Sequence, residues 1–313
     1  MRIIILTALI LISQQTLSQD GGFDEVDSYV DGLQLRKNVS IEKLVITLTK
    51  PFASPTLKTR AIYYWIAKNI KYDYAGSETG FWKKYPSDQA IIADTYKFRR
   101  GVCSGYSHLF KYMLTKTKIE SEVVGGYGRG DLQTVIVEEA NHAWNAVKLN
   151  DKWYLFDVTW ASDLSKKVVD FWFQTSPDIF ILSHYPENSK WTLLGKNISL
   201  TEFKNLPIYT RSFIEMQLVK SYPQKGYYRT TDNTVTIDLS TTKEYLWLAK
   251  LYDLDRDEWF SPTNVEDRAF QKGFINLTID RKGKFILRLN ALENGDGSFT
   301  LYEGLLYYIV ECK

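Results

Sequence analysis

Two apolar runs separated by one turn dipeptide constrain the fold of this chain more than any other feature. The runs cover residues 141–149 and 153–159, and Asn150-Asp151 lies between them. Asparagine and aspartate favour the backbone of a two-residue hairpin turn, because both tolerate left-handed conformations. The sequence therefore predicts two antiparallel strands joined at this dipeptide.

The register of this hairpin brings an acidic residue close to a histidine. With the turn at Asn150-Asp151, Trp144 lies opposite Asp157, and His142 lies on the same face as Trp144. His142 and Asp157 are then diagonal neighbours within side-chain reach, whereas a slip of one residue would put them on opposite faces. An aspartate in a buried apolar strand is costly without a partner, and His142 would supply one. The alternative is that Asp157 only caps the end of its strand.

A cysteine lies where a helix is expected to begin. Val102, Tyr106 and Met113 recur with helical period, which puts Cys103 in the first turn of a buried helix. The free N–H groups and the dipole at that end of a helix favour a thiolate, and an Arg-Arg pair at residues 99–100 adds positive charge nearby. The alternative is a buried structural cysteine.

Three histidines could serve Cys103 as a base. His108 follows it by five residues, which is about 140° away round a helix. His184 lies in an irregular segment, and its position gives no geometric argument. His142 begins a strand and has a candidate carboxylate partner, so it is the best candidate.

Composition narrows the classes of protein that this chain can belong to. Its 39 basic and 37 acidic residues give a net charge of +2, without the basic excess of a nucleic-acid-binding protein. Aromatic residues make up 15% of the chain, which excludes long disorder. Only two cysteines are present, Cys103 and the penultimate Cys312. An exported chain stabilised by disulfides would carry more, so Cys103 is interpreted as a thiol kept for chemistry.

The N-terminal residues have the pattern of a signal peptide. Arg2 supplies a positive charge, residues 3–12 are almost wholly apolar, and Thr16-Leu17-Ser18 offers small residues for cleavage. The apolar stretch is too short to cross a bilayer as a helix. We expect cleavage near Ser18 and a secreted or periplasmic mature protein without a membrane span. The alternative is an N-terminal membrane anchor.

The chain changes character after about residue 212, where short β-rich runs alternate with turn signals. That spacing is typical of an all-β sandwich of about a hundred residues. The predicted organisation is a signal peptide (1–18), an N-terminal segment (19–55), a catalytic domain (56–205), a linker (206–216) and a β-sandwich module (217–313).

Three sequence blocks resemble the core of the transglutaminase-like superfamily. They are RRGVCSGY at residues 99–106, NHAWNAV at 141–147 and WYLFDVTW at 153–160. The later segments SHYP (183–186) and KW (190–191) are similar to the kyphoscoliosis-peptidase-like branch of that superfamily. The resemblance covers residues 57–205, and more weakly the β-rich C-terminal part.

The resemblance implies an α+β fold, in which a papain- or transglutaminase-like core precedes a C-terminal all-β, immunoglobulin-like sandwich. It implies Cys103 as nucleophile, His142 as base and Asp157 as the carboxylate that orients the histidine. The backbone N–H of Cys103 is expected to be one oxyanion donor, with Gln89 or a tryptophan as the second. Nothing matches the calcium-site pattern of large animal transglutaminases, so we expect no metal and no cofactor.

These expectations describe a secreted thiol enzyme that acts on peptide or glutamine amides through a thioester. With water as the acceptor it would be a peptidase, which we favour; with a primary amine it would be a protein-crosslinking acyltransferase. A third possibility is a non-catalytic binding or scaffold protein on the same fold. The expected partner is a protein or peptide substrate and no nucleic acid, and the C-terminal module is expected to bind protein or glycan.

Overall fold

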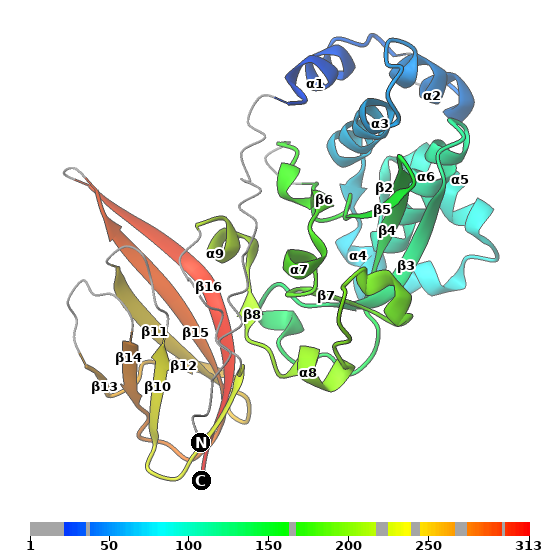
Figure 1. Cartoon of the computed structure of the whole chain (residues 1–313). Helices are drawn as coiled ribbons and strands as arrows, with labels where there is room; N and C mark the ends of the chain where they lie inside the picture. The colour runs from blue at the N-terminus through cyan, green and yellow to red at the C-terminus, as the bar shows by residue number, and fades with distance from the viewer. Residues whose placement is uncertain are drawn as a thin grey trace, which may run out of the picture.

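A computed structural model of the chain describes residues 22–35, 38–162, 167–216, 225–238, 245–266, 274–295 and 298–313. Figure 1 shows two bodies, one of helices around a sheet and the other of long β-strands. The expected signal peptide lies outside the described residues. Within these ranges, no helix is both long and apolar enough to span a bilayer.

The first body has an antiparallel sheet with helices packed against it. Its strand order is β6-β5-β4-β3-β7. The strands are β3 (Ser121–Gly128), β4 (His142–Leu149), β5 (Lys152–Phe156), β6 (Phe173–Thr175) and β7 (His184–Pro186). Its helices are α1 (Asp24–Asp31), α2 (Ile41–Thr49), α3 (Pro55–Asn69), α4 (Tyr74–Glu78), α5 (Asp88–Phe98), α6 (Cys103–Thr115), α7 (Pro177–Phe180) and α8 (Leu200–Lys204), whereas α9 (Arg211–Glu215) packs against the second body.

Short elements complete this body. Strands β1 (Lys71–Tyr72) and β2 (Arg100–Gly101) form a parallel pair. Strand β2 leads directly into α6. The 3-10 turns are η1 (Phe81–Lys84), η2 (Leu132–Thr134), η3 (Asp170–Trp172) and η4 (Ser189–Thr192).

The predicted hairpin is β4 and β5. Leu149 pairs with Lys152 and Asn145 with Phe156, so the predicted register is confirmed. The turn residues Asn150 and Asp151 have φ of 49° and 63°, the left-handed conformation that these side chains tolerate. The residues of the hairpin therefore take the faces that the sequence predicted.

Helix α6 packs against β3 and β4 and is covered by α2 and α3. Tyr106 and Phe110 of α6 are fully buried in a core that also takes up Leu44 and Leu48 of α2. The N-terminal segment thus contributes apolar side chains to the same core as α6. Buried apolar area of this kind is the main force that fixes the position of a helix.

The second body is a β-sandwich, and the predicted α+β core followed by an all-β sandwich is confirmed. One sheet has the order β12-β11-β15-β16-β8, with β9 also paired to β16, and the other has the order β10-β14-β13. The strands are β8 (Ile208–Tyr209), β9 (Tyr227–Thr230), β10 (Thr234–Asp238), β11 (Leu246–Asp253), β12 (Glu258–Phe260), β13 (Asn264–Glu266), β14 (Phe274–Thr278), β15 (Gly283–Asn294) and β16 (Phe299–Cys312).

The stretch expected to be a linker, residues 206–216, carries regular structure. Strand β8 pairs with β16 of the larger sheet. Phe213 and Ile214 of α9 are buried in the core of the sandwich. Apolar packing therefore ties this stretch to the second body, whereas the sequence predicted a linker there.

Candidate active site

Helix α6 begins at Cys103, as the apolar period predicted. Val102 is its N-cap residue and has an extended backbone, without a side-chain cap. The start of α6 lies very close to α5, since a Cβ on Gly105 would come within 2.4 Å of Thr95 Oγ1. Cys103 is partly exposed, whereas Cys312 is buried.

His142 and Asp157 are in contact across the hairpin, as the register predicted. Nε2 of His142 lies 2.7 Å from Oδ2 of Asp157. The side chain of Asp157 is fully buried, and its Oδ1 accepts hydrogen bonds from the backbone N–H groups of Thr159 (2.8 Å) and Trp160 (3.0 Å). Asp157 therefore does cap the turn after its strand, and it holds the histidine as well.

The charges of this pair stabilise each other. Burial alone would raise the pKa of Asp157, but His142 and then His184 hold the pKa of that carboxyl well below its usual range. Burial alone would lower the pKa of His142, yet the charge and hydrogen bond of Asp157, together with the hydrogen bond and charge of Cys103, raise it to about 10. Because Nε2 is bonded to Asp157, Nδ1 is the ring nitrogen left for Cys103.

A second histidine, which the sequence argument set aside, completes the site. Nε2 of His184 lies 3.1 Å from the same Asp157 oxygen, and Ser183 Oγ lies 2.8 Å from its Nδ1. Burial lowers the pKa of His184 to about 4. The hydrogen bond and charge of Asp157 oppose this shift, and the charge of His142 adds to it. A neutral His184 then donates from Nε2 to Asp157 and accepts from Ser183 at Nδ1.

The strand β7 brings His184 to the site, because Gly128 of β3 pairs with it. One signal for this residue was present in the sequence, namely the SHYP segment that resembles the kyphoscoliosis-peptidase-like branch. Aromatic rings then fix both imidazoles. The ring of His184 stacks on Phe180 at 4.0 Å, and that of His142 stacks on Trp160 at 5.1 Å.

Cys103 opens into a cleft of about 750 Å³. Tyr72 and Val102 line one part of the cleft, and residues 136–141 line another. Gln89, one expected oxyanion donor, is exposed on α5 and is not among the lining residues. His108 faces Asp88, with 3.5 Å between Nδ1 and Oδ2.

The cleft wall at residues 136–141 is supported by the second body. Val135, directly before this wall, is buried in a small apolar cluster with Ile208, Ile286 and Tyr307. Arg129, which is also buried, donates to the Val135 carbonyl at 3.3 Å and to the Phe203 carbonyl at 2.7 Å. The wall is therefore held by side chains from β8, β15 and β16.

His142, Asp157 and His184 are also a set that could hold a metal ion, since their ligand atoms lie within 4.8 Å of one another. Two imidazoles and a carboxylate suit several transition metals. Here both imidazoles bond one carboxylate oxygen. A cation at this point would have to replace both hydrogen bonds.

Comparison with known proteins agrees with this arrangement. Residues 42–158 match the family model of the transglutaminase-like superfamily, and residues 200–313 match the KY-like, immunoglobulin-like domain. Residues 42–158 are therefore a transglutaminase-like domain, and residues 200–313 an immunoglobulin-like domain. The first match covers the helical body from α2 to β5, and the second covers α8, α9 and the β-sandwich.

Two known proteins align with most of this chain. Kyphoscoliosis peptidase of Homo sapiens is 28% identical over 304 residues, which cover 93% of this chain and 43% of that protein. Hillarin of Drosophila melanogaster is 23% identical over 311 residues, which cover 86% of this chain and 36% of that protein. The chain spans less than half the length of these relatives. A crystal structure described as a TGase aligns with 47% of this chain and 35% of its own, at 15% identity and a TM-score of 0.28.

Proposed function

We propose that this protein is a thiol enzyme that cleaves amide bonds of peptides or of glutamine side chains. The observation that carries the proposal is the pair of His142 and buried Asp157, with 2.7 Å between Nε2 and Oδ2, and Cys103 at the start of α6 close enough to raise the pKa of His142. A nucleophile, a base and a carboxylate that orients the base are the parts that acyl transfer needs.

In the first half of the reaction, the thiolate of Cys103 attacks the amide carbonyl carbon. The C–N bond then breaks, a thioester forms, and the departing amine takes a proton from Nδ1 of His142. The raised pKa of His142 keeps that proton available at neutral pH. The backbone N–H of Cys103 is free at the helix start and can stabilise the oxyanion.

In the second half, neutral His142 accepts a proton from water while the oxygen of that water attacks the thioester. The C–S bond breaks, the carboxylic acid leaves, and Cys103 returns as a thiolate beside protonated His142. Asp157 holds the His142 ring in place through both halves and stabilises its positive charge. His184 does not touch the reacting atoms and acts through Asp157.

We favour water over an amine as the acceptor, so the proposed activity is peptidase-like. The name of the human relative, a peptidase, agrees with this choice. An amine acceptor would use the same Cys103, His142 and Asp157 and would give a crosslinking acyltransferase. We also propose that the protein is exported, on the signal-peptide pattern of residues 1–18, and that the β-sandwich binds protein or glycan.

Alkylation by iodoacetamide tests the proposal. At neutral pH, Cys103 should react much faster than buried Cys312, whose pKa is raised by burial, and faster than free cysteine. His142→Ala should reduce the Cys103 rate to that of an ordinary exposed cysteine, and Cys103→Ala should abolish the fast reaction. Equal rates at the two cysteines, or a Cys103 rate that His142→Ala leaves unchanged, would favour the non-catalytic scaffold instead.

A further inference from the structure

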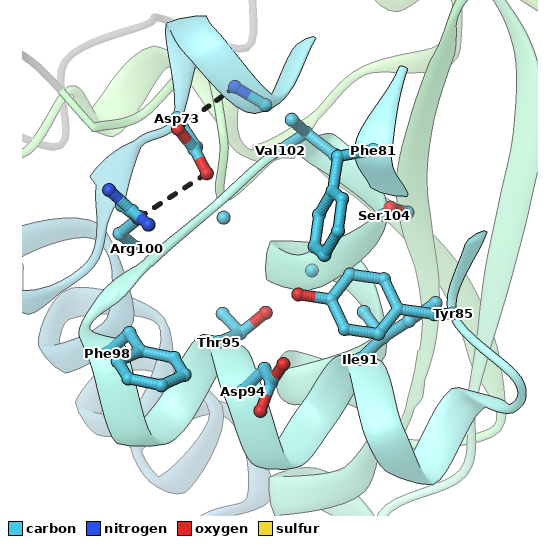
Figure 2. Close-up of a pocket in the computed structure, with 13 residues that line it drawn as sticks. Asp73, Phe81, Tyr85, Ile91, Asp94, Thr95, Phe98, Arg100, Val102 and Ser104 are labelled. Carbon is cyan, nitrogen blue, oxygen red and sulfur yellow. Dashed lines mark hydrogen bonds and ion pairs between the residues drawn. The ribbon is translucent and has the colours of Figure 1, made fainter. Parts of the chain in front are cut away.

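A second cavity lies beside the start of α6, separate from the cleft that holds the Cys103 thiol. It has a volume of about 260 Å³ and is lined by α5, by η1 and by residues 100–102, 104 and 105 (Figure 2). Val102 lines both this cavity and the Cys103 cleft. Whatever occupies the cavity therefore lies next to the proposed nucleophile.

The walls of the cavity are aromatic. Phe81 and Phe98 line it with 53% and 57% of their surface exposed. Figure 2 shows Phe98 on one side and Phe81 and Tyr85 on the other, with Asp94 between them. Exposed aromatic rings around a small cavity can pack against an aliphatic chain, and their faces attract a cation. The ammonium of Lys97 already lies 5.0 Å from the centroid of the Phe98 ring.

The polar groups of the cavity carry a net negative charge. Asp73 is already paired with Arg100, with 3.4 Å from Oδ2 to Nε, and its Oδ1 accepts from Gly76 N at 3.1 Å. Asp94 lies beside Tyr85, whose pKa is raised by burial and then by the charge of Asp94. In the described part of the chain, no basic side chain lies within ion-pair distance of Asp94. One carboxylate at the cavity is therefore without a counter-charge.

We propose that this cavity binds one positively charged side chain of the substrate, a lysine or an arginine. The volume falls below the roughly 300–1,000 Å³ of pockets for whole small molecules, and fits one side chain. The aliphatic part would pack on Phe81 and Phe98, and the charged end would bond Asp94. This assignment rests on the proposed function and adds a substrate preference to it.

The bound side chain would be recognised and would not react. An ammonium group paired with Asp94 keeps its proton, so it has no lone pair with which to attack a thioester. Because Val102 lines both spaces, the basic residue is expected close in sequence to the amide that Cys103 attacks. The preference therefore concerns a residue that flanks the cleaved bond.

Binding measured without catalysis tests the cavity directly. In the full chain carrying Cys103→Ala, nuclear magnetic resonance titration would compare N-acetyl-lysine methylamide with its uncharged norleucine analogue. The lysine probe should bind about fivefold more tightly, as expected for one partly exposed ion pair with a cation–π contact. Adding Asp94→Asn should remove this preference. The matched control is Asp88→Asn, at the start of the same helix and 72% exposed, which should keep it.

A second variant, Phe98→Ala, removes an exposed ring and should weaken both probes. Equal binding of the two probes, or a lysine preference that survives Asp94→Asn, would overturn the assignment. Iodoacetamide reactivity of Cys103, measured in chains that retain the cysteine, separates this result from the proposed function. If Cys103 is reactive but lysine is not preferred, only the assignment of the cavity is rejected. If lysine is preferred but Cys103 is unreactive, only the proposed thiol-enzyme activity is rejected.

Discussion

His184 bonds the Asp157 oxygen that also bonds His142, with 3.1 Å between Nε2 and Oδ2. His142 occupies the same oxygen at 2.7 Å, and two backbone N–H groups occupy Oδ1. A carboxylate has about four lone-pair sites, and all of them are used here. Both imidazoles are therefore oriented by one buried group, and a change at either histidine reaches the other through Asp157.

Asp157→Asn should impair Cys103 severely. Oδ1 would continue to accept from the backbone, so the amide nitrogen would replace Oδ2 and point its hydrogens at both Nε2 atoms. His142 would lose its negative partner and would have to change tautomer. The iodoacetamide rate at Cys103 should fall about 10- to 30-fold at pH 7, because an ordinary cysteine is only a few per cent thiolate there. An unchanged rate with an intact fold would contradict this role for Asp157.

His184→Gln should reduce Cys103 reactivity by loosening Asp157, although His184 touches no reacting atom. We expect a loss of roughly tenfold, as for partners that orient a site ligand, and a downward shift of the pH at which His142 loses its proton. The matched control is His108→Gln, since His108 contacts Asp88 outside the site. The pH–rate profile of alkylation measures both effects. A lower rate with an unshifted profile would indicate only a structural role.

His184 should also make the fold sensitive to acid. Its pKa is about 4 in the folded protein and 6.5 ordinarily, so between these values the unfolded chain binds a proton that the folded chain does not. The free energy of unfolding should therefore fall as the pH drops from 6.5 to 4, by up to about 1.4 kcal/mol per pH unit. Urea unfolding over this range should show a clearly shallower slope for His184→Gln. Burial also lowers the pKa of His108, but the charge of Asp88 opposes that effect, so His108→Gln should reduce the slope less.

Gly128→Ala should displace the His142 ring. A Cβ at this position would lie 2.9 Å from Cβ and 3.1 Å from Cγ of His142. Misplacement of a reacting group by about 1 Å can cost about 10²-fold in rate. Gly125→Ala on the same strand is the control, because its Cβ would meet only the end of the Glu187 side chain, at 3.1 Å. Circular dichroism should be unchanged in both variants, and only Gly128→Ala should slow alkylation of Cys103.

The part of the site that could be predicted from sequence is the part set by local geometry. The turn at Asn150-Asp151 fixes which residues of β4 and β5 face each other, so the contact between His142 and Asp157 follows from counting along the hairpin. The apolar period of α6 gives the place of Cys103 in the same way. Each argument needs only a periodicity and one turn.

The rest depends on contacts between distant segments. Strand β7 has three residues, too few for a period, and its register with β3 follows from packing around Gly126, where a Cβ would come within 2.2 Å of the Tyr185 carbonyl. His184 could therefore not be assigned by counting. The same holds for Val135, whose burial against Tyr307 requires the β-sandwich to be in place.

Support of the cleft wall by Val135 and Arg129 has a practical consequence for tests of the proposed activity. A fragment that ends near residue 205 would keep Cys103, His142 and Asp157, yet it would lose Ile208, Ile286 and Tyr307, against which Val135 is buried. Its cleft would then have one unsupported side, and substrates chosen with such a fragment would report a looser specificity than the whole chain possesses. The β-sandwich in this sense helps to shape the cleft, and tests of the proposed selectivity require it.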